Sequence, residues 1–248
     1  MNYIYGINSV AEALKARGRA FAWVGVAKER HDLRLQRVVD ECRRQGVAVR
    51  FVDRAELDRM AGNNAHQGVV AVTSAKHYND LDDVVAAKRG ANSLIVVLDG
   101  VEDPHNLGAI LRTADAAGAD GVVFSAASVD PYNSKCVRSS AGSLFHLPVV
   151  AGPPLTDVIS GLRAAGLQVL AADGRASHVL DDPASGPDLT LPTAWLFGNE
   201  AWGLPDGLRA LADAVVAVPI YGRAESLNLA AAAAVCLYAS ARQARVRP

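Results

Sequence analysis

The residues that suggest chemistry in this 248-residue sequence lie in three short stretches. The first, "LDGVEDPHNLGAILRTADAAGA" (98–119), leads from an apolar run through a polar turn into a predicted helix, with Asn106 as a candidate N-cap. Arg112 follows Gly108 by one turn, so its guanidinium could lean back toward the turn, where a substrate phosphate or hydroxyl would bind. The spacing of these residues by itself fits an ordinary surface arginine at least as well as a substrate-binding one.

The second stretch is "LFGNEAWGLP" (196–205), in which a predicted buried strand stops at Gly198. Gly198 and Gly203 permit tight turns and close approach of a ligand to the backbone. Glu200 is either a catalytic or orienting carboxylate or a solvated loop residue, and this motif by itself favours the second interpretation.

The third stretch, "VPIYGRAESLNLAAAAA" (218–234), is a polar loop that runs into an alanine-rich helix. Ser226 and Asn228 stand at the start of that helix, where Ser226 could simply be the N-cap. The alternative is that the loop presents backbone groups to a cofactor, while small residues let neighbouring segments pack closely behind it.

The elements that must position these stretches alternate between strands and helices. An apolar run without alternation, "LIVVLDG" (94–100), is typical of a strand buried on both faces of a parallel sheet. In the C-terminal part the patterns predict strands over 94–100, 121–124, 167–172, 193–198 and 213–220, and helices over 107–117, 134–144 and 155–165 before the alanine-rich one. In the N-terminal part they predict helices over 8–16, 33–46 and 54–61, and strands over 21–27, 47–52 and 67–73. We therefore predict an α/β protein with a parallel, doubly wound C-terminal sheet and a small N-terminal α/β unit.

Composition excludes several classes of protein. No apolar run reaches the roughly 18 to 20 residues of a membrane span, and the N-terminus lacks the residue order of a secretory signal. Three scattered cysteines and six dispersed histidines suggest neither a disulfide framework nor a metal site, so we expect no metal, no membrane and a cytoplasmic protein. The glycine-rich patterns G-x-G-x-x-G and G-x-x-x-x-G-K-[ST] and the hydrolase pattern G-x-S-x-G are absent from the sequence.

Charge is distributed unevenly along the chain. Residues 1–75 hold 12 Lys and Arg against 8 Asp and Glu, a balance of +4, whereas the whole chain carries −1. This balance makes the N-terminal part better suited to attract RNA phosphates, although a solvated surface explains it about equally well.

Taken together and in this order, the three stretches resemble the motifs of the SpoU, or TrmH, family of RNA ribose 2'-O-methyltransferases in the SPOUT superfamily. The family pattern N-x-G-x-x-x-R-[TS]-A is matched by Asn106, Gly108, Arg112, Thr113 and Ala114. The pattern G-x-E-x-x-G-[LM] is matched by Gly198, Glu200, Gly203 and Leu204. The third, [IV]-P-[IM]-x-G-x-x-x-S-L-N-[VL]-[AS], is matched by Val218, Pro219, Ile220, Gly222, Ser226, Leu227, Asn228, Leu229 and Ala230.

This resemblance implies a C-terminal SPOUT domain (93–248) with a trefoil knot, a linker (76–92) and an N-terminal RNA-binding domain (1–75). It implies S-adenosylmethionine as the cofactor, held largely by backbone groups around Gly198, Val218, Ile220 and Leu227. It also implies a homodimer and a set of catalytic residues: Arg112, Asn106, Glu200, Ser226 and Asn228. A guanidinium is a poor base, because it keeps its proton up to strongly alkaline pH. We therefore expect Arg112 to grip a phosphate and stabilise the developing oxyanion. Glu200, Ser226 and Asn228 would orient the ribose and Arg112, and Asn106 would fix the first loop.

The target is less sharply defined. "YGINSVAEAL" and "AHQGVVA" resemble the accessory domain of this family's 23S rRNA guanosine methyltransferases, in which Asn8 would contact RNA. "VDPYNSKCVRSSAGSLFHLPVV", which holds a second candidate RNA contact, Arg138, is similar to the branch that methylates a 23S rRNA adenosine and confers thiostrepton resistance. A 23S rRNA guanosine is the favoured target; an adenosine, a tRNA ribose and a non-catalytic RNA-binding role remain alternatives.

Overall fold

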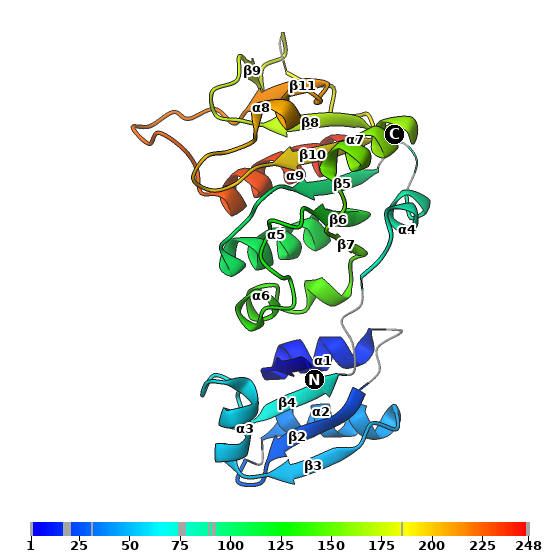
Figure 1. Cartoon of the computed structure of the whole chain (residues 1–248), viewed down its shortest axis with the longest axis vertical. Helices are drawn as coiled ribbons and strands as arrows, with labels where there is room; N and C mark the ends of the chain where they lie inside the picture. Colours follow the sequence, from blue (N-terminus) through cyan, green and yellow to red (C-terminus); the bar gives the residue numbers. More distant parts are fainter. Residues whose placement is uncertain are drawn as a thin grey trace. The chain divides into compact units, whose positions relative to one another are not determined.

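A computed structural model describes residues 2–16, 21–30, 32–73, 78–88, 90, 93–184 and 186–246. The chain divides into two compact units (Figure 1). The first comprises Met1–His77 with Pro131–His146, and the second comprises Tyr78–Asp130 with Leu147–Pro248.

The first unit is built on a four-stranded sheet with the order β1-β4-β2-β3. β4 is antiparallel to β1 and β2, whereas β2 and β3 are parallel. The elements are β1 (Asn2–Tyr5), α1 (Ile7–Lys15), β2 (Phe21–Ala27), α2 (Leu33–Arg44), β3 (Val49–Val52), α3 (Arg54–Ala61) and β4 (Val69–Thr73). The sequence patterns predict all of these except β1, which is too short for its period to stand out.

The first helix begins differently from the expectation. Its N-cap is Gly6, with φ of 93°, and the helix begins at Ile7, one residue before the predicted range of 8–16. Glycine adopts this φ without a steric penalty, which permits a sharp turn directly after β1. The first helical N–H, that of Ile7, is satisfied from far along the chain by the side-chain oxygen of Gln67, at 3.0 Å.

Residues 134–144 do not form the single helix predicted for them. α6 (Ser134–Ser139) ends early, and a separate 3-10 turn, η2, spans Ser143–Phe145. Between them Ala141 and Gly142 have φ of 51° and 106°, and this left-handed backbone interrupts a helix.

The second unit contains a seven-stranded sheet with the order β7-β6-β5-β10-β8-β11-β9, and every pairing in it is parallel. The elements are α4 (Leu81–Ala86), β5 (Leu94–Leu98), α5 (Pro104–Ala117), β6 (Gly121–Phe124), β7 (Val149–Ala151), α7 (Leu155–Ala164), β8 (Gln168–Ala172), β9 (His178–Val179), β10 (Thr193–Phe197), α8 (Asp206–Arg209), β11 (Ala214–Ala217) and α9 (Leu229–Val246). This confirms the predicted fold class, an α/β protein with a parallel C-terminal sheet and a separate N-terminal α/β unit.

Helices cover both faces of the parallel sheet. On one face α4 and α7 bury an aliphatic core that includes Val97 and Leu196. On the other face Trp195 and Phe197 stack with ring centroids 6.1 Å apart, and the indole N–H of Trp195 donates to Ser240 of α9 at 2.9 Å. Both faces of β5 and β10 are therefore buried, as the unalternating apolar runs predict.

The alanine-rich helix α9 packs along α5 and against β10 and β5. The buried side of α9 includes Ala233, Cys236, Leu237 and Ser240. Because most of these side chains are small, the two helices can approach each other closely, which explains the loss of bulk in this part of the sequence.

Candidate active site

The three motif stretches meet at one edge of the parallel sheet. β5, β10 and β11 run in the same direction, so their carboxyl ends lie on the same edge. The loops that follow these strands, 99–103, 198–205 and 218–228, are the three stretches singled out in the sequence. Ligands bind beyond the carboxyl ends of strands in open α/β sheets, which makes this edge the candidate site.

The start of α5 corrects one expectation. Its N-cap is Asp103, whose carboxylate accepts from the backbone N–H of His105 at 2.8 Å, with Pro104 as the first helical residue. Asn106 is therefore not the cap but a residue of the first turn. The Asp-Pro pair is the sequence signal that would have located this boundary, because proline favours the first helical position. The consequence is that the Asn106 side chain is available for contacts outside the helix.

The carboxylate of Glu200 accepts three hydrogen bonds across this edge. The backbone N–H groups of Glu102 and Asp103 donate to its two oxygens at 3.2 and 3.3 Å, and the Asn106 side-chain amide donates at 3.1 Å. Two of these donors belong to the chain just before the α5 helix and the third to its first turn. Glu200 therefore fixes the β10 loop to the start of α5, and its oxygens are already engaged as acceptors.

Asn228 extends this network to α9. Its amide nitrogen donates to the side-chain oxygen of Asn106 at 3.0 Å, while its own oxygen accepts from the backbone N–H groups of Ala230 and Ala231 at 2.9 and 3.3 Å. Asn228, and not Ser226, is thus the residue that caps α9. The chain Glu200–Asn106–Asn228 joins all three motif stretches by direct side-chain hydrogen bonds.

The β10 loop is shaped by close backbone contact. A Cβ placed on Gly198 would lie 2.2 Å from the backbone carbon of Gly203 and 2.4 Å from the backbone nitrogen of Leu204, so only glycine fits there. Asn199 and Gly203 exchange two backbone hydrogen bonds of 3.0 Å. The buried amide of Asn199 also donates to the carbonyl of Gly100 at 2.6 Å. The sequence reasoning missed Asn199, although its position between Gly198 and Glu200 placed it in the motif.

The β11 loop carries the other expected cofactor residues. Val218 and Ile220 are half-buried, and Leu227 is 39% exposed. Among the described residues, no group of 218–227 takes part in a hydrogen bond, so the backbone N–H and C=O groups of this loop are available to a ligand. Such backbone groups and neighbouring apolar side chains are suited to hold a nucleoside.

The remaining predicted residues lie outside the hydrogen-bonded network. Arg112 is exposed on α5, about 9 Å along the axis from Asn106, and it forms no ion pair with the part of the chain that the structure describes. Ser226 is exposed in the β11 loop, two residues before Asn228. Asn8 and Arg138 are exposed residues of the other unit.

The described ranges contain no group of three or more His, Cys, Asp or Glu side chains arranged to bind a metal ion. Within the same ranges, no helix combines the length and the apolar character that a bilayer span requires. The hydrogen-bonded site is built from amides and one carboxylate, and Arg112 lies outside it, further along α5. These groups can orient a polyhydroxylated or phosphorylated substrate beside the loop 198–205, whose close backbone contacts require a glycine at position 198.

Comparisons with known proteins agree with this geometry. Residues 93–238 match the model of the SpoU rRNA methylase family, and residues 3–79 match a domain described as RNA 2'-O ribose methyltransferase substrate binding. The chain is 36% identical over 244 residues to the 23S rRNA (guanosine-2'-O-)-methyltransferase RlmB of Haemophilus influenzae, covering 97% of each protein.

Solved structures are similar over nearly the whole chain. The SpoU methyltransferase AviRb from Streptomyces viridochromogenes, in complex with the cofactor AdoMet, superposes with a TM-score of 0.84 at 31% identity, over 99% of this chain and 91% of that one. An AdoMet-bound rRNA methyltransferase from Sinorhizobium meliloti gives a TM-score of 0.80 at 31% identity, over 97% and 87% of the two chains.

Proposed function

The chain belongs to the SpoU rRNA methylase family, and from this membership we propose that it transfers the methyl group of S-adenosylmethionine to a ribose 2'-hydroxyl of 23S rRNA, at a guanosine. The observation that carries the proposal is the Glu200–Asn106–Asn228 network, which ties the three family motifs together at the carboxyl edge of the sheet. Guanosine is favoured because the RlmB relative is similar over 97% of both chains.

The residues present fit the cofactor. The backbone groups of 218–227 form no hydrogen bond with the described residues, and Gly198 brings the β10 loop into tight contact with itself. We propose that backbone groups around Gly198, Val218, Ile220 and Leu227 hold S-adenosylmethionine, which supplies a methyl group activated by its sulfonium. We further propose that the C-terminal chain threads a trefoil knot. The insertion of β10 between β5 and β8, which both precede it in the chain, supports this topology.

The chemistry left to the protein is alignment of the ribose and stabilisation of charge. A ribose hydroxyl becomes a good nucleophile as it loses its proton, and negative charge then develops on its oxygen. A guanidinium holds five N–H donors and a permanent positive charge, so Arg112 would bind the adjacent phosphate and that oxygen. Glu200 accepts three hydrogen bonds already, which suits it to hold Asn106 and the α5 start in place. Ser226 and Asn228 would orient the ribose from the other side.

We also propose a cytoplasmic homodimer. The outer side of α9 exposes Val235 and Tyr238 by 41% and 46%, which gives an apolar strip that a second copy would cover. The proposed rRNA substrate favours the cytoplasm. The division of labour would follow the expected boundaries, with an RNA-binding domain (1–75), a linker (76–92) and a catalytic domain (93–248). Asn8 and Arg138 remain predicted RNA contacts.

The test is to incubate the purified protein with S-adenosylmethionine labelled in its methyl group and either protein-free 23S rRNA or total tRNA, and then to map the 2'-O-methyl positions. We expect one guanosine of 23S rRNA to be modified and tRNA to remain unlabelled. Labelling of an adenosine or of tRNA would refute the proposed target. Binding of S-adenosylmethionine in calorimetry without transfer to any RNA would instead support a non-catalytic RNA-binding protein.

A further inference from the structure

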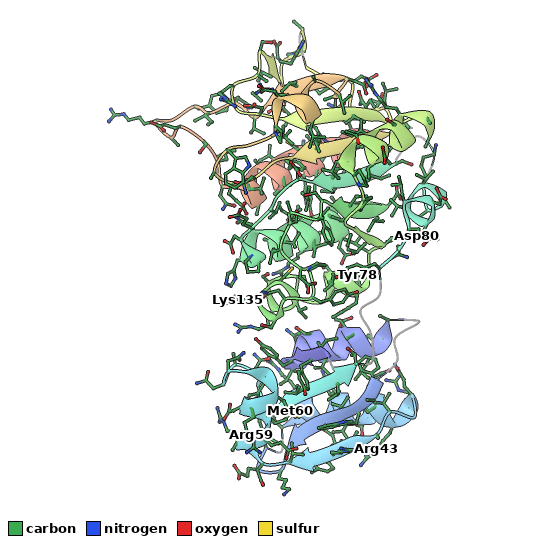
Figure 2. All side chains as sticks on the ribbon, viewed as in Figure 1. Arg43, Arg59, Met60, Tyr78, Asp80 and Lys135 are labelled. Atoms are coloured by element: carbon green, nitrogen blue, oxygen red, sulfur yellow. The ribbon has the colours of Figure 1, made fainter. Side chains whose placement is uncertain are left out.

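One face of the four-stranded sheet in the first unit is only partly covered by a helix. α3 is eight residues long, about 12 Å, and it follows β3 directly. Its Leu57 packs with Tyr5, Ala27, Val52 and Val70, which lie where β2 and β3 end. The other end of the same face, where β2 and β3 begin, lies beyond this cluster. Figure 2 marks α3 by the labels Arg59 and Met60.

A row of three side chains crosses this end of the face beyond the Leu57 cluster, with an aromatic ring on either side of a valine. Tyr3 and Trp23 both pair with Val72 of β4, so the three residues lie side by side across β1, β4 and β2. Tyr3 is two residues before Tyr5 on β1, which places it on the face that α3 partly covers. Val72, in the middle of the row, is 1% exposed, whereas Tyr3 is 39% exposed. The ring of Tyr3 therefore lies at the surface.

A glycine lets the indole of Trp23 lie over the neighbouring row. Gly25 pairs with Arg50 of β3, and a Cβ on Gly25 would come within 3.1 Å of the Trp23 ring. The guanidinium carbon of Arg50 lies 4.5 Å from the centroid of that ring, a cation–π contact. The indole of Trp23 therefore lies on the sheet, and the guanidinium of Arg50 lies over the indole.

The charge of Arg50 is not neutralised by any residue in the described part of the chain. Arg50 is exposed and forms no ion pair or hydrogen bond with the described residues. A planar cation that rests on an indole and faces solvent is a surface on which a nucleobase can stack, because bases stack on both aromatic rings and guanidinium planes. The +4 balance of residues 1–75, from 12 basic and 8 acidic side chains, favours the RNA backbone over another copy of the same positive surface.

We propose that Tyr3, Trp23 and Arg50 form a stacking platform for an unpaired base of the substrate RNA. Arg50 provides the outer plane, Trp23 supports it from below, and Tyr3 extends the surface across the sheet. The inference rests on the proposed function in that the RNA is the methylation substrate, and it assigns part of the RNA affinity to a site in the first unit. Since stacking on a base is tolerant of sequence, the platform would select for an unstacked nucleotide and not for its identity.

The test measures the affinity of the full-length protein for protein-free 23S rRNA by filter binding. Arg50→Gln and Trp23→Leu are each expected to raise the Kd by about five- to a hundredfold, the range that loss of one stacked base produces. The Kd for S-adenosylmethionine and kcat at saturating RNA are expected to stay unchanged. Phe51→Leu is the matched control, because Phe51 is 53% exposed on β3 and alternates to the opposite face of the sheet.

Arg50→Lys separates stacking from simple charge attraction. Lysine keeps the positive charge but lacks the plane, so this variant is expected to bind RNA nearly as weakly as Arg50→Gln. Wild-type affinity in Arg50→Lys would reduce the site to a phosphate contact and overturn the platform. If Trp23→Leu does not fold, the two Arg50 variants decide the question, since that side chain is exposed.

Unchanged RNA affinity in Arg50→Gln would also overturn the proposal. If this variant also sedimented differently from the wild type, the face would be a protein–protein contact. Failure of the wild-type protein to methylate RNA would count against the proposed function instead. The platform would still be judged by the binding measurements alone.

Discussion

Replacement of Glu200 by glutamine changes one atom in the network that joins the three motif loops. The carboxylate accepts from two backbone N–H groups, those of Glu102 and Asp103, and from the Asn106 amide, at 3.1 to 3.3 Å. Glutamine offers one acceptor oxygen and one NH₂ group, so at least one of the three donors must face another donor. The loop at the start of α5 would lose its fixed position.

The magnitude follows from the strength of these bonds. A hydrogen bond to a charged group contributes about 1.5 to 3 kcal/mol, and the lower end applies because Glu200 is exposed. We therefore expect Glu200→Gln to lower kcat for methyl transfer to 23S rRNA about tenfold, which corresponds to about 1.4 kcal/mol. The Kd for S-adenosylmethionine and the thermal midpoint should change little. Glu102→Gln is the matched control, since it removes the same charge from the adjacent loop without touching the network.

A double-mutant cycle makes the test specific. Glu200 and Asn228 do not contact each other but both bind Asn106, so the effects of Glu200→Gln and Asn228→Ala should be strongly non-additive. We expect the kcat of the double variant to be only slightly lower than the kcat of the less active single variant. The reasoning would be refuted if Glu200→Gln matched wild type and Glu102→Gln, or if the two effects added fully.

Three further predictions concern stability and reactivity. Gly198→Ala would place its Cβ 2.2 Å from the backbone carbon of Gly203, so we expect a loss of several kcal/mol of folding free energy in denaturant titrations and little methyl transfer. Burial raises the pKa of the Cys236 thiol to about 12, so iodoacetamide at pH 8 should modify Cys236 only after unfolding, as mass spectrometry would show. A side-chain hydrogen bond from Arg163 lowers the pKa of Asp213, so this carboxylate stabilises the fold above the ordinary aspartate pKa and loses its effect as the pH falls through the lowered value. Asp213→Asn should therefore cost less than about 1 kcal/mol at pH 7, and this cost should shrink as the pH falls through the lowered pKa; a cost that does not change with pH would contradict this.

The edge of the sheet at which the site lies was predictable because it depends on sheet direction. The unalternating apolar runs ending near Leu98 and Gly198 indicate parallel strands, and parallel strands bring their carboxyl ends to one edge. Sheet direction alone does not make these loops neighbours, because the order of the strands was not predicted. The prediction that Asn106, Glu200 and Asn228 belong to one site came from the resemblance to the three family motifs, and in the structure side-chain hydrogen bonds join the three residues.

The details that escaped prediction depend on competition between similar residues. Asp103 and Asn106 are both good N-caps, and Pro104 is the local signal, overlooked in the sequence, that favours Asp103. Asn228 caps α9 in preference to Ser226, because its side chain can cap the helix and also reach Asn106. This second choice involves a contact between distant segments, which no local pattern contains.

The glycines also show which features the sequence predicts and which it does not. The sequence predicts tight turns at Gly198 and Gly203, and the structure shows the contact that requires the first of them. The sequence does not predict that Ala141 and Gly142 interrupt the helix expected over 134–144. An alanine with left-handed backbone angles is rare and has no sequence signature.

The measurement that tests the central claim most directly is single-turnover methyl transfer by Arg112→Lys, together with calorimetry of S-adenosylmethionine binding. Arg112 is expected to act on the RNA through the planar fork of its guanidinium, so the variant should bind S-adenosylmethionine normally and transfer the methyl group at least about a hundredfold more slowly. Transfer at the wild-type rate, or loss of cofactor binding in step with activity, would contradict the role assigned to Arg112 at this sheet edge.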